Sequence, residues 1–396
     1  MNQAAVLAPP LPALSPGRSL LIAVIGFLTL VDLFATQAIL PSLAAEYGVM
    51  PSEIGVAANS TTLGMAIAGL LVGAFSGNVE RKRAILLSLL LLAIPTAALA
   101  YAPNLTVFSL LRITQGLFMA AAFTLTLTHL AERCEHRTAT ALAAYVTGVV
   151  ASNLIGRLTA AFVAGIVGAT SSFLFFAALN VAGALLIAVA LHRNEPEPMA
   201  GRGRFWTSWL NHLADPALRR TFAIGFLILF GFIGVFTYVG FVLMRPPHML
   251  SMGALGLVFL VFAPSMLTTP TAGRITNRFG PGITVPASLA VALLGLVLML
   301  LPSLIGVIIG MTLVGIGTFF AQAVATGHVG RIAQGDKAAA SGLYLSSYYC
   351  GGLFGAALVG RLFDQFGWNA AVAGVFAALG LAALLGLKLR TKKEDE

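Results

Sequence analysis

Charged side chains are scarce in this sequence. Only 9% of its 396 residues are Asp, Glu, Lys or Arg, whereas 58% are hydrophobic. A soluble domain of ordinary composition has about a quarter charged residues. This scarcity, together with a mean hydropathy of +0.94, excludes a soluble enzyme and a soluble nucleic-acid-binding module. The composition indicates an integral membrane protein.

Cysteines and catalytic motifs are also lacking. The two cysteines, Cys134 and Cys350, have no spacing typical of a disulfide framework or a metal site. No cluster of His, Cys, Asp or Ser in the apolar segments has metal-site or catalytic-triad spacing, and no glycine-rich loop is followed by Lys-Ser or Lys-Thr. We therefore expect no enzyme activity, no catalytic or metal-binding residues, no cofactor and no drive by ATP.

Apolar runs long enough to cross a bilayer recur along the whole chain. About 20 helical residues cross the roughly 30 Å of hydrocarbon. Charges, prolines and polar clusters divide the sequence into twelve predicted helices, at residues 19–41, 53–77, 84–102, 105–130, 138–166, 171–192, 221–244, 252–274, 283–301, 303–327, 338–361 and 369–389.

The longest polar interruption separates the first six of these helices from the last six. It is rich in Pro, Gly and charged residues, and its segment 205–213 is expected to form a short interfacial helix. The predicted organisation is a cytoplasmic tail over 1–18, a six-helix bundle over 19–192, a cytoplasmic linker over 193–220, a second six-helix bundle over 221–389 and a cytoplasmic tail over 390–396.

The two halves share residues at a constant offset of 199 positions. The matching pairs are Gly116 and Gly315, His129 and His328, Tyr145 and Tyr344, and Gly156 and Gly355. They fall at corresponding points of corresponding helices, which indicates a tandem duplication. The predicted fold class is an all-α membrane protein with twelve transmembrane helices in two pseudo-symmetric six-helix bundles. Repeated halves around a midplane site are a known transporter design.

The positive charges gather on one side of this predicted topology. With the N-terminus in the cytoplasm, most of the 23 Lys and Arg residues fall in cytoplasmic segments, and the outside loops hold only Arg245 and Arg361. This asymmetry follows the positive-inside rule, so it explains the net charge of +9 without nucleic acid. We expect a multi-pass protein of a bacterial inner membrane with both termini cytoplasmic and no cleavable signal peptide.

Several segments resemble motifs of the major facilitator superfamily. GAFSGNVERKR (73–83) and GRITNRFGPG (273–282) are similar to its loop signature Gly-x-x-x-Asp-Arg-x-Gly-Arg-Lys/Arg, and LLRITQGL (110–117) is similar to its Arg-x-x-Gln-Gly motif. GVVASNLIGRL (148–158) resembles, without the proline, the glycine-rich motif of the drug:proton antiporter branch. FTYVGFVL and YLSSYYCGGLFG resemble segments of bacterial drug or arabinose efflux permeases. The resemblance implies the major facilitator fold and transport across a membrane.

The resemblance also implies that the two signature loops gate the cytoplasmic side. The implied gating residues are Gly73, Glu80, Arg81, Lys82, Gly273, Asn277 and Arg278. Gly77 and Asn277 stand where the family has an aspartate that caps a neighbouring helix and helps to latch the outward-facing state. The latch is therefore altered in this chain, and Glu80 is a candidate substitute for the missing acid.

Three charged residues are predicted to lie well inside helices: Asp32, Arg112 and Arg157. Counting from the outer helix ends at about 1.5 Å per residue puts all three at one depth. An aspartate there costs about 2.5 to 3.5 kcal/mol on insertion scales, which points to function. An ion pair of Asp32 with either arginine would reduce this cost. The alternative interpretation is a pair that only fastens helices together.

Asp32 is the candidate protonation site of a transport cycle. Burial favours a neutral carboxyl and a nearby guanidinium favours a charged one, so movement of an arginine or arrival of substrate would load or release a proton. Arg112, in the motif that the resemblance associates with proton transfer, would tune Asp32. Arg157 is a second tuner or a substrate contact. Because the three charges sum to a positive value, an organic anion is a candidate substrate.

Polar side chains on the corresponding helix faces extend the predicted site. The predicted substrate-cavity residues are Thr36, Gln115, Asn153, Arg157, Tyr238, Gln322, Tyr344 and Tyr348. Tyrosines supply both an apolar face and a hydroxyl that orients a ligand. The alternative for each of the four residues in the second half (Tyr238, Gln322, Tyr344 and Tyr348) is a hydrogen bond between packed helices.

These observations predict a secondary active transporter that works by alternating access. Proton-coupled efflux of a small organic solute, such as a drug or a sugar, is the first hypothesis. The alternatives are a passive facilitator or a proton-coupled importer of a small organic anion or sugar, with lipid movement between leaflets as a third. The expected partners are the substrate, protons and membrane lipid, with no nucleic acid, and the expected state is a monomer.

Overall fold

The protein is described by a computed structural model over residues 15–75, 80–133, 138–190 and 205–389. These described residues are almost entirely helical and contain no strand. Eleven helices among them are long and apolar enough to cross a membrane. One of these, α15 (Lys337–Gly386), has 50 residues and turns at Gly367, whose φ is 79°. It therefore contains two membrane spans, and the predicted all-helical fold with twelve spans is confirmed.

The first six spans occupy the N-terminal half. They are α1 (Pro16–Ala35) with η1 (Thr36–Ile39) and α2 (Leu40–Tyr47), α3 (Pro51–Phe75), α4 (Arg81–Ala98) with η3 (Leu99–Tyr101), α5 (Leu105–Arg133), α6 (Thr138–Val167) and α7 (Ser172–Ala190).

The C-terminal half begins with the short helix α8 (Phe205–Ala214), which confirms the helix expected at 205–213. The next span is α9 (Pro216–Met244). The span after it is broken into five pieces: α10 (Met252–Val258), η4 (Phe259–Phe262), α11 (Ala263–Thr268), η5 (Thr269–Thr271) and α12 (Ala272–Phe279). The remaining spans are α13 (Pro281–Leu298), α14 (Leu304–Ile332) and the two within α15.

Prolines explain where the spans depart from regular helix. The first span runs to Tyr47 rather than ending at residue 41, because Pro41 interrupts the hydrogen bonding without ending the helix. A proline ring opposes the carbonyl four residues earlier, which here belongs to Gln37, and the segment Thr36–Ile39 is accordingly a 3-10 turn. Pro264 likewise opposes the carbonyl four residues earlier, that of Leu260, which lies in the 3-10 turn η4. Both breaks lie next to the site described below.

Helix boundaries repeat at the offset that relates the two halves. The starts of α5 at Leu105 and α14 at Leu304 are 304 − 105 = 199 residues apart, and those of α6 at Thr138 and α15 at Lys337 are 337 − 138 = 199 apart. The two turn glycines also match, since Gly168 has φ of 89°, Gly367 has φ of 79°, and 367 − 168 = 199. A left-handed turn at both positions supports a duplication.

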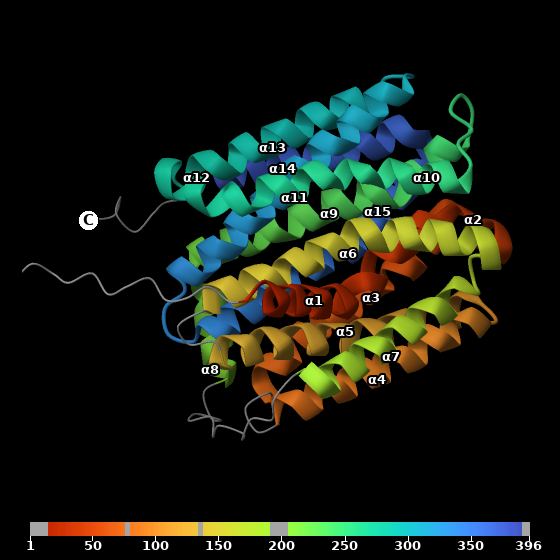
Figure 1. The fold of residues 1–396 in the computed structure, drawn as a ribbon. Coiled ribbons are helices and arrows are strands. Elements are labelled where there is room, and N and C mark those ends of the chain that lie inside the picture. Colours follow the sequence, from red (N-terminus) through yellow and green to blue (C-terminus); the bar gives the residue numbers. More distant parts are fainter. Residues whose placement is uncertain (1–14, 76–79, 134–137, 191–204, 390–396) are drawn as a thin grey trace, which may run out of the picture.

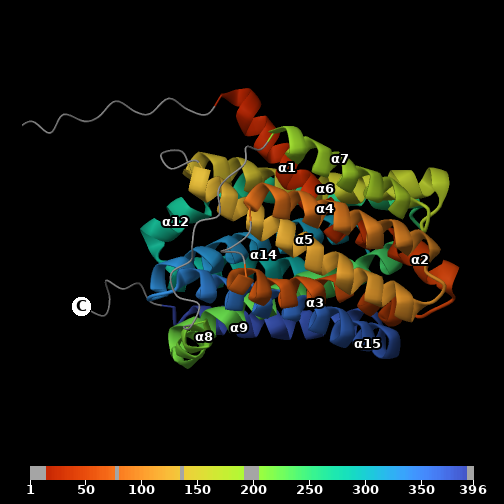
Figure 2. The same ribbon diagram turned by 90° about the horizontal axis from the view of Figure 1, so that it is seen from below.

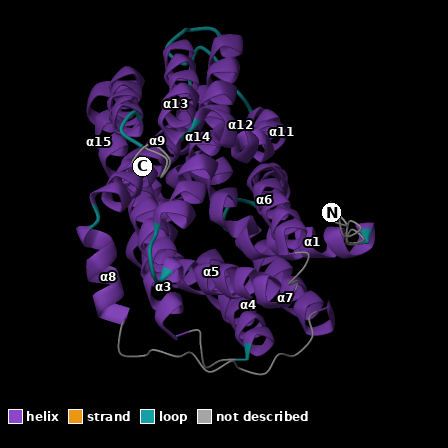
Figure 3. Cartoon of the chain, turned by 90° about the vertical axis from the view of Figure 1, so that its left-hand side faces the viewer, coloured by secondary structure: helices purple, strands orange, loops and turns teal. Residues whose placement is uncertain are grey.

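The helices lie side by side, as Figure 1 shows, and Figure 3 views them end on, with α1 and α3–α7 below and α9 and α11–α15 above. Within the N-terminal half α1 packs on α6, α3 on α5, and α4 on α5 and α7; within the C-terminal half α9 packs on α15, and α13 on α14 and α15. The halves meet where α3 packs on α15 and α6 on α10. The predicted tail over 390–396, most of the tail over 1–18 and the start of the linker lie outside the described residues.

One end of the bundle carries most of the described basic residues. In Figures 1 and 2 both α8 and α12 lie at this end, and α2 lies at the other. His212 Nε2 lies 2.8 Å from the carbonyl oxygen of Asp336, which joins α8 to the start of α15. We call this the basic end; its residues are Arg18, Arg81, Lys82, Arg83, Arg219, Arg220, Arg274, Arg278, Arg331, Lys337 and Lys388. The opposite end carries Arg245 and Arg361.

Candidate functional site

Asp32 lies inside the N-terminal half, where α1 faces α4, α5 and α7, and is 3% exposed. Its Oδ2 accepts hydrogen bonds from Asn180 Nδ2 at 2.7 Å, from Gln115 Nε2 at 3.2 Å and from Thr96 Oγ1 at 3.4 Å. Its Oδ1 has no hydrogen-bond partner among the described residues. The carboxyl is therefore held through one oxygen by neutral donors, of which the Thr96 hydroxyl shares its single proton with the Leu92 carbonyl at 2.8 Å.

Arg112 is fully buried beside this carboxyl, but its donors are directed elsewhere. Its Nε donates to the carbonyl of Ala58 at 2.8 Å, its Nη1 to Gln115 Oε1, and its Nη2 to the carbonyl of Leu33 at 3.5 Å. The described part of the chain contains no ion pair within 4.0 Å between Asp32 and either buried arginine. This differs from the expected ion pair, because the Gln115 amide bridges Asp32 and Arg112 and two further N–H groups of Arg112 donate to main-chain carbonyls.

We call Asp32, Thr96, Arg112, Gln115 and Asn180 the carboxyl cluster. Thr96 and Asn180 were not among the predicted site residues, although Asn180 is the only amide side chain in α7. Thr36 of the predicted cavity lines a narrow gap together with Asp32, Arg112 and Gln115, and the gap has no room for a water molecule in this conformation.

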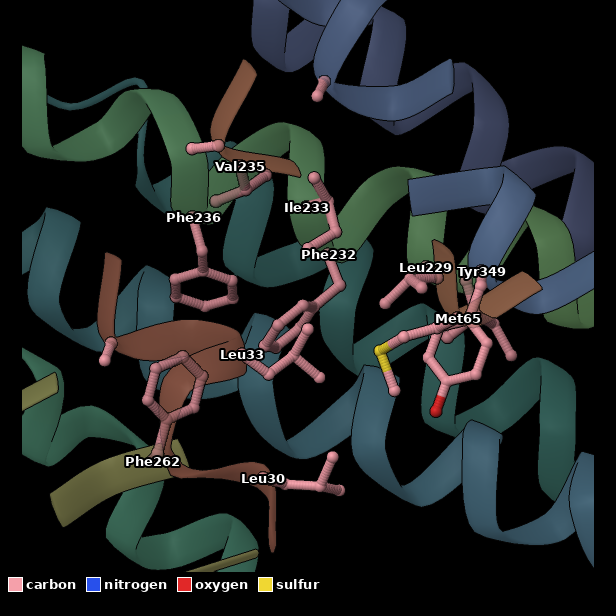
Figure 4. Packing of buried hydrophobic residues seen from close by; sticks show 14 of the residues in the cluster. Leu30, Leu33, Met65, Leu229, Phe232, Ile233, Val235, Phe236, Phe262 and Tyr349 are labelled. Carbon is pink, nitrogen blue, oxygen red and sulfur yellow. The ribbon is translucent and has the colours of Figure 1, made fainter. Parts of the chain in front are cut away.

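Arg157 of α6 occupies a separate position and is 0% exposed. Its Nη1 donates to Asn153 Oδ1, four residues earlier on the same helix, and its Nη2 to Gln37 Oε1. Its guanidinium carbon lies 4.4 to 5.8 Å from the ring centroids of five phenylalanines: Phe34, Phe232, Phe236, Phe259 and Phe262. Figure 4 shows Phe232, Phe236 and Phe262 gathered in the apolar packing. We call the five rings the phenylalanine cage.

The cage lies between the two halves. Phe34 belongs to α1, whereas the other four rings belong to α9 and η4. Gln37 also donates to Asn59 Oδ1 at 3.3 Å, and Asn59 donates to Thr237 Oγ1 of α9 at 3.1 Å. A chain of hydrogen bonds thus runs from Arg157 across the interface.

The structure therefore divides the three buried charges that the sequence analysis grouped in one site. On α1, Phe34 lies two residues beyond Asp32, about 200° further round the helix axis. Asp32 accordingly contacts helices of its own half, while Phe34 packs against Phe232 of the other half with ring centroids 5.8 Å apart.

The predicted residues of the C-terminal half form a third group, except for one. The Tyr344 hydroxyl donates to Gln322 Oε1 at 2.8 Å, and the Tyr344 and Tyr348 rings are stacked with centroids 6.3 Å apart. Tyr238 lies apart from them. Its hydroxyl donates to the carbonyl of Ala356 at 2.5 Å, and its ring stacks on Phe363, which is the packing role considered as the alternative.

The described gating residues make local contacts at the basic end. Lys82 Nζ donates to the carbonyl of Ala188 at 2.6 Å, so it caps the last turn of α7. Glu80 pairs with Arg83 at 2.7 Å, and Arg81 is 8% exposed.

In the second loop, Asn277 Oδ1 accepts from Arg331 Nη1 at 3.2 Å, and Arg278 lies over the Phe279 ring at 5.2 Å. Gly73 falls within α3 and Gly273 within α12. Gly77 lies outside the described residues.

A helical membrane protein built from two repeated halves, with buried charged side chains inside and between them, has the architecture of a secondary transporter. The chain belongs to the Major Facilitator Superfamily, whose sequence profile matches residues 22–267 and 244–396.

Known transporters align with nearly the whole chain. The inner membrane transport protein YnfM of Escherichia coli (strain K12) is 30% identical over 376 residues, which cover 93% of this chain and 89% of that protein. The crystal structure of the nucleoside transporter NupG (D323A mutant) has a TM-score of 0.76 at 14% identity and covers 94% of this chain and 99% of NupG.

A bacterial homologue of the human lysosomal transporter Spinster, in an inward-facing and unoccupied conformation, has a TM-score of 0.72 at 15% identity over 95% and 97% of the two chains. At these identities the two structures show the fold alone. Together with the superfamily match and the relatives, they establish a multi-pass membrane transporter, and the relatives are named as transporters rather than enzymes.

Proposed function

We propose that this chain is a proton-coupled exporter of a small organic solute, an antiporter of the drug or sugar efflux type, with Asp32 as the group that binds and releases the proton. The observation that carries this proposal is a carboxyl buried to 3% exposure, with no cation within 4.0 Å among the described residues and with one oxygen free of partners.

The hydrogen bonds of Asp32 are compatible with both of its protonation states. All three donors act on Oδ2, so a proton placed on Oδ1 breaks none of them. A buried carboxylate without a paired cation is costly, whereas the neutral acid is cheaper to bury. The neutral donors favour the charged form, so a structural change that moves them away from Oδ2 would favour uptake of a proton.

Access of the proton to Asp32 requires movement, because the gap beside the carboxyl has no room for a water molecule. The same helix also carries the link to the other half. Asp32 is hydrogen-bonded to helices of the N-terminal half, whereas Phe34 belongs to the phenylalanine cage and Gln37 accepts a hydrogen bond from Arg157. A shift of α1 on proton binding would therefore change the interface on which alternating access depends.

We also propose that the basic end faces the cytoplasm of a bacterial inner membrane and that both termini lie there. The described basic residues concentrate at that end, while only Arg245 and Arg361 lie at the opposite end of the described chain. The positive-inside rule supports this orientation, and YnfM is named as an inner membrane protein.

Counterflow in proteoliposomes tests the coupling. A thermal-shift screen over antibiotics, sugars and organic acids supplies a transported solute, and its counterflow is then measured with and without an imposed pH gradient. We expect the gradient to accelerate transport by the wild-type protein. The Asp32→Asn variant should retain exchange and lose at least about nine-tenths of this acceleration.

Glu46→Gln is the matched control, because Glu46 is an exposed acid at the opposite end and its loss should leave the acceleration unchanged. Full acceleration in Asp32→Asn would refute the role of Asp32.

Passive facilitation, or import of an organic anion or sugar, is the second candidate. The observation in its favour is that hydrogen bonds to Asp32 tie α1 to α4, α5 and α7, as those of a purely structural group would. Counterflow that is indifferent to the gradient in the wild-type protein identifies this alternative.

A further inference from the structure

We propose that Arg157 binds the carboxylate of a small aromatic acid, and that the ring of this ligand takes the place of phenylalanines from the C-terminal half when the halves separate. This inference rests on the proposed transport function, for which it names the substrate class. It is carried by three features of Arg157: an unbalanced charge, an unused donor and a cage of rings from both halves.

No acidic side chain among the described residues balances the charge of Arg157. A guanidinium stays protonated in proteins, and Arg157 is 0% exposed. Its hydrogen-bond partners are the neutral amide oxygens of Asn153 and Gln37, and the described chain provides no carboxylate within 4.0 Å of it. A buried cation without a counter-ion is expensive, so a ligand anion at this position would gain a charge-assisted bond.

A donor for that anion is already in place. Arg157 Nε has no hydrogen-bond partner among the described residues, although the atom is buried. The planar guanidinium fork matches a carboxylate, which accepts two parallel N–H bonds. Asn153 and Gln37 hold the two terminal nitrogens, so the orientation of the fork is fixed before a ligand arrives.

The surroundings of the fork select an aromatic ligand. Five phenylalanine rings surround the guanidinium at 4.4 to 5.8 Å, and a cation is attracted to such ring faces. A sugar placed here would leave hydroxyl groups unsatisfied among the rings, which is costly, and a cationic drug would be repelled. An aromatic acid supplies a ring face like that of phenylalanine together with the missing negative charge.

The two halves contribute unequally to the surroundings of Arg157, and this asymmetry gives a ligand a route to the guanidinium. Arg157, Asn153, Gln37 and Phe34 belong to the N-terminal half, whereas the other four rings belong to α9 and η4. Separation of the halves would withdraw these four rings together and leave the fork in place. The contacts that must open lie close by, since Gly256 of α10 packs directly against Ala161, one turn beyond Arg157 on α6.

Binding of radiolabelled benzoate to the purified full-length protein tests the proposal. We expect saturable binding that unlabelled benzoate displaces, that benzamide does not displace because it lacks the charge, and that cyclohexanecarboxylate displaces more weakly because it lacks the ring. Arg157→Gln should weaken benzoate binding about tenfold to a hundredfold, which is the range for a lost hydrogen bond to a charged group.

Two further variants show whether the fork itself is responsible. Arg157→Lys keeps the charge and loses the fork, so its affinity should fall between those of the wild-type protein and Arg157→Gln. Arg361→Gln removes an exposed arginine at the opposite end and should bind benzoate as the wild-type protein does.

Benzoate affinity that is unchanged in Arg157→Gln, equal displacement by benzamide, or no saturable binding to the wild-type protein would each overturn the proposal. Equal displacement by cyclohexanecarboxylate would overturn its aromatic part. If Arg157→Gln binds benzoate as tightly as the wild-type protein, then Arg157 serves only through its cation–π contacts, and the phenylalanine cage is a latch between the halves.

A measurement without ligand separates this proposal from that of proton coupling. Spin labels on Glu46→Cys and Met249→Cys, with both native cysteines replaced, report the separation of the two halves at the opposite end as pH is varied. A pH response that Asp32→Asn abolishes, without benzoate binding, would support proton coupling and reject the aromatic acid. Benzoate binding without any pH response would do the reverse.

Discussion

At the scale of single residues, the state of Asp32 depends on a few neutral donors. Asn180 Nδ2 makes the shortest of these bonds, at 2.7 Å, and it lies on α7, which carries no other amide. Because the donors stabilise the carboxylate without neutralising it, each of them sets how readily the carboxyl binds a proton.

Replacing Asn180 by leucine should therefore shift the pH dependence of transport. Loss of a donor destabilises the carboxylate, so the proton binds more tightly and the midpoint of the transport profile moves to higher pH. A hydrogen bond to a charged group contributes about 1.5 to 3 kcal/mol, equivalent to roughly one to two pH units. The measurement is the rate of gradient-driven transport between pH 5 and 9.

Thr114→Val is the control for this series, because within the described chain the Thr114 hydroxyl bonds only to the Leu110 carbonyl of its own helix. A midpoint that moves to lower pH in Asn180→Leu, or that moves equally in the control, would contradict the assignment of Asn180.

The residue scale also shows where prediction from the sequence stops. Rare charges in apolar helices identified Asp32, Arg112 and Arg157, and all three are buried. Counting residues gives the depth of a side chain in the membrane, but it does not fix the rotation of the helix about its axis or the choice among partners. For this reason Arg157 was grouped with Asp32, and its actual partner Gln37 was missed.

At the scale of helices, α1 and the 3-10 turn that follows it connect the carboxyl cluster to the phenylalanine cage and Arg157. The 3-10 turn Thr36–Ile39 brings Gln37 to Arg157 and Asn59. It forms because Pro41 cannot donate a hydrogen bond to the Gln37 carbonyl. The twelve spans followed from hydropathy, but this local break at the site could not be placed from composition alone.

Replacing Pro41 by alanine should allow regular helix through this segment and turn Gln37 away from Arg157. Removing a proline from a helix interior is favourable by up to about 3 kcal/mol, so we expect an unchanged or higher unfolding temperature together with a several-fold lower transport rate. Pro286→Ala, inside α13, should affect stability similarly and leave transport intact. A variant of Pro41 with normal transport would show that the break has no role in the cycle.

Close helix crossings impose a second constraint at this scale. A side chain at Gly148 of α6 would collide with the backbone of Ala23 on α1, whereas nothing lies within 4 Å of a side chain at Gly165. Gly148→Val should therefore destabilise the protein by about 1 to 3 kcal/mol, the usual cost of overpacking. Thermal unfolding in detergent compares it with Gly165→Val, which should be close to wild type, and equal stability of the two variants would refute the crossing.

At the scale of the whole molecule, the halves are joined at the opposite end. The Ser42 hydroxyl lies 3.2 Å from the Met252 sulfur, and the Ser52 amide donates to Asp364 at 3.2 Å. Each contact joins the N-terminal to the C-terminal half. The residues repeated at an offset of 199 positions predicted two bundles, but which end is closed is a property of how the two halves pack together rather than of the sequence of either half.

Alternating access requires that these contacts break in every cycle. In a chain without its native cysteines, the pair Ser42→Cys and Met252→Cys should form a disulfide under mild oxidation that abolishes solute counterflow, and a reducing agent should restore it. Each single cysteine variant is the control and should be insensitive to oxidation. Mass spectrometry of the joined peptides measures whether cross-linking is complete. Counterflow that continues after complete cross-linking would mean that the solute crosses without separation of the halves at this end. Both the proton cycle and the entry of an anion to Arg157 would then need another route.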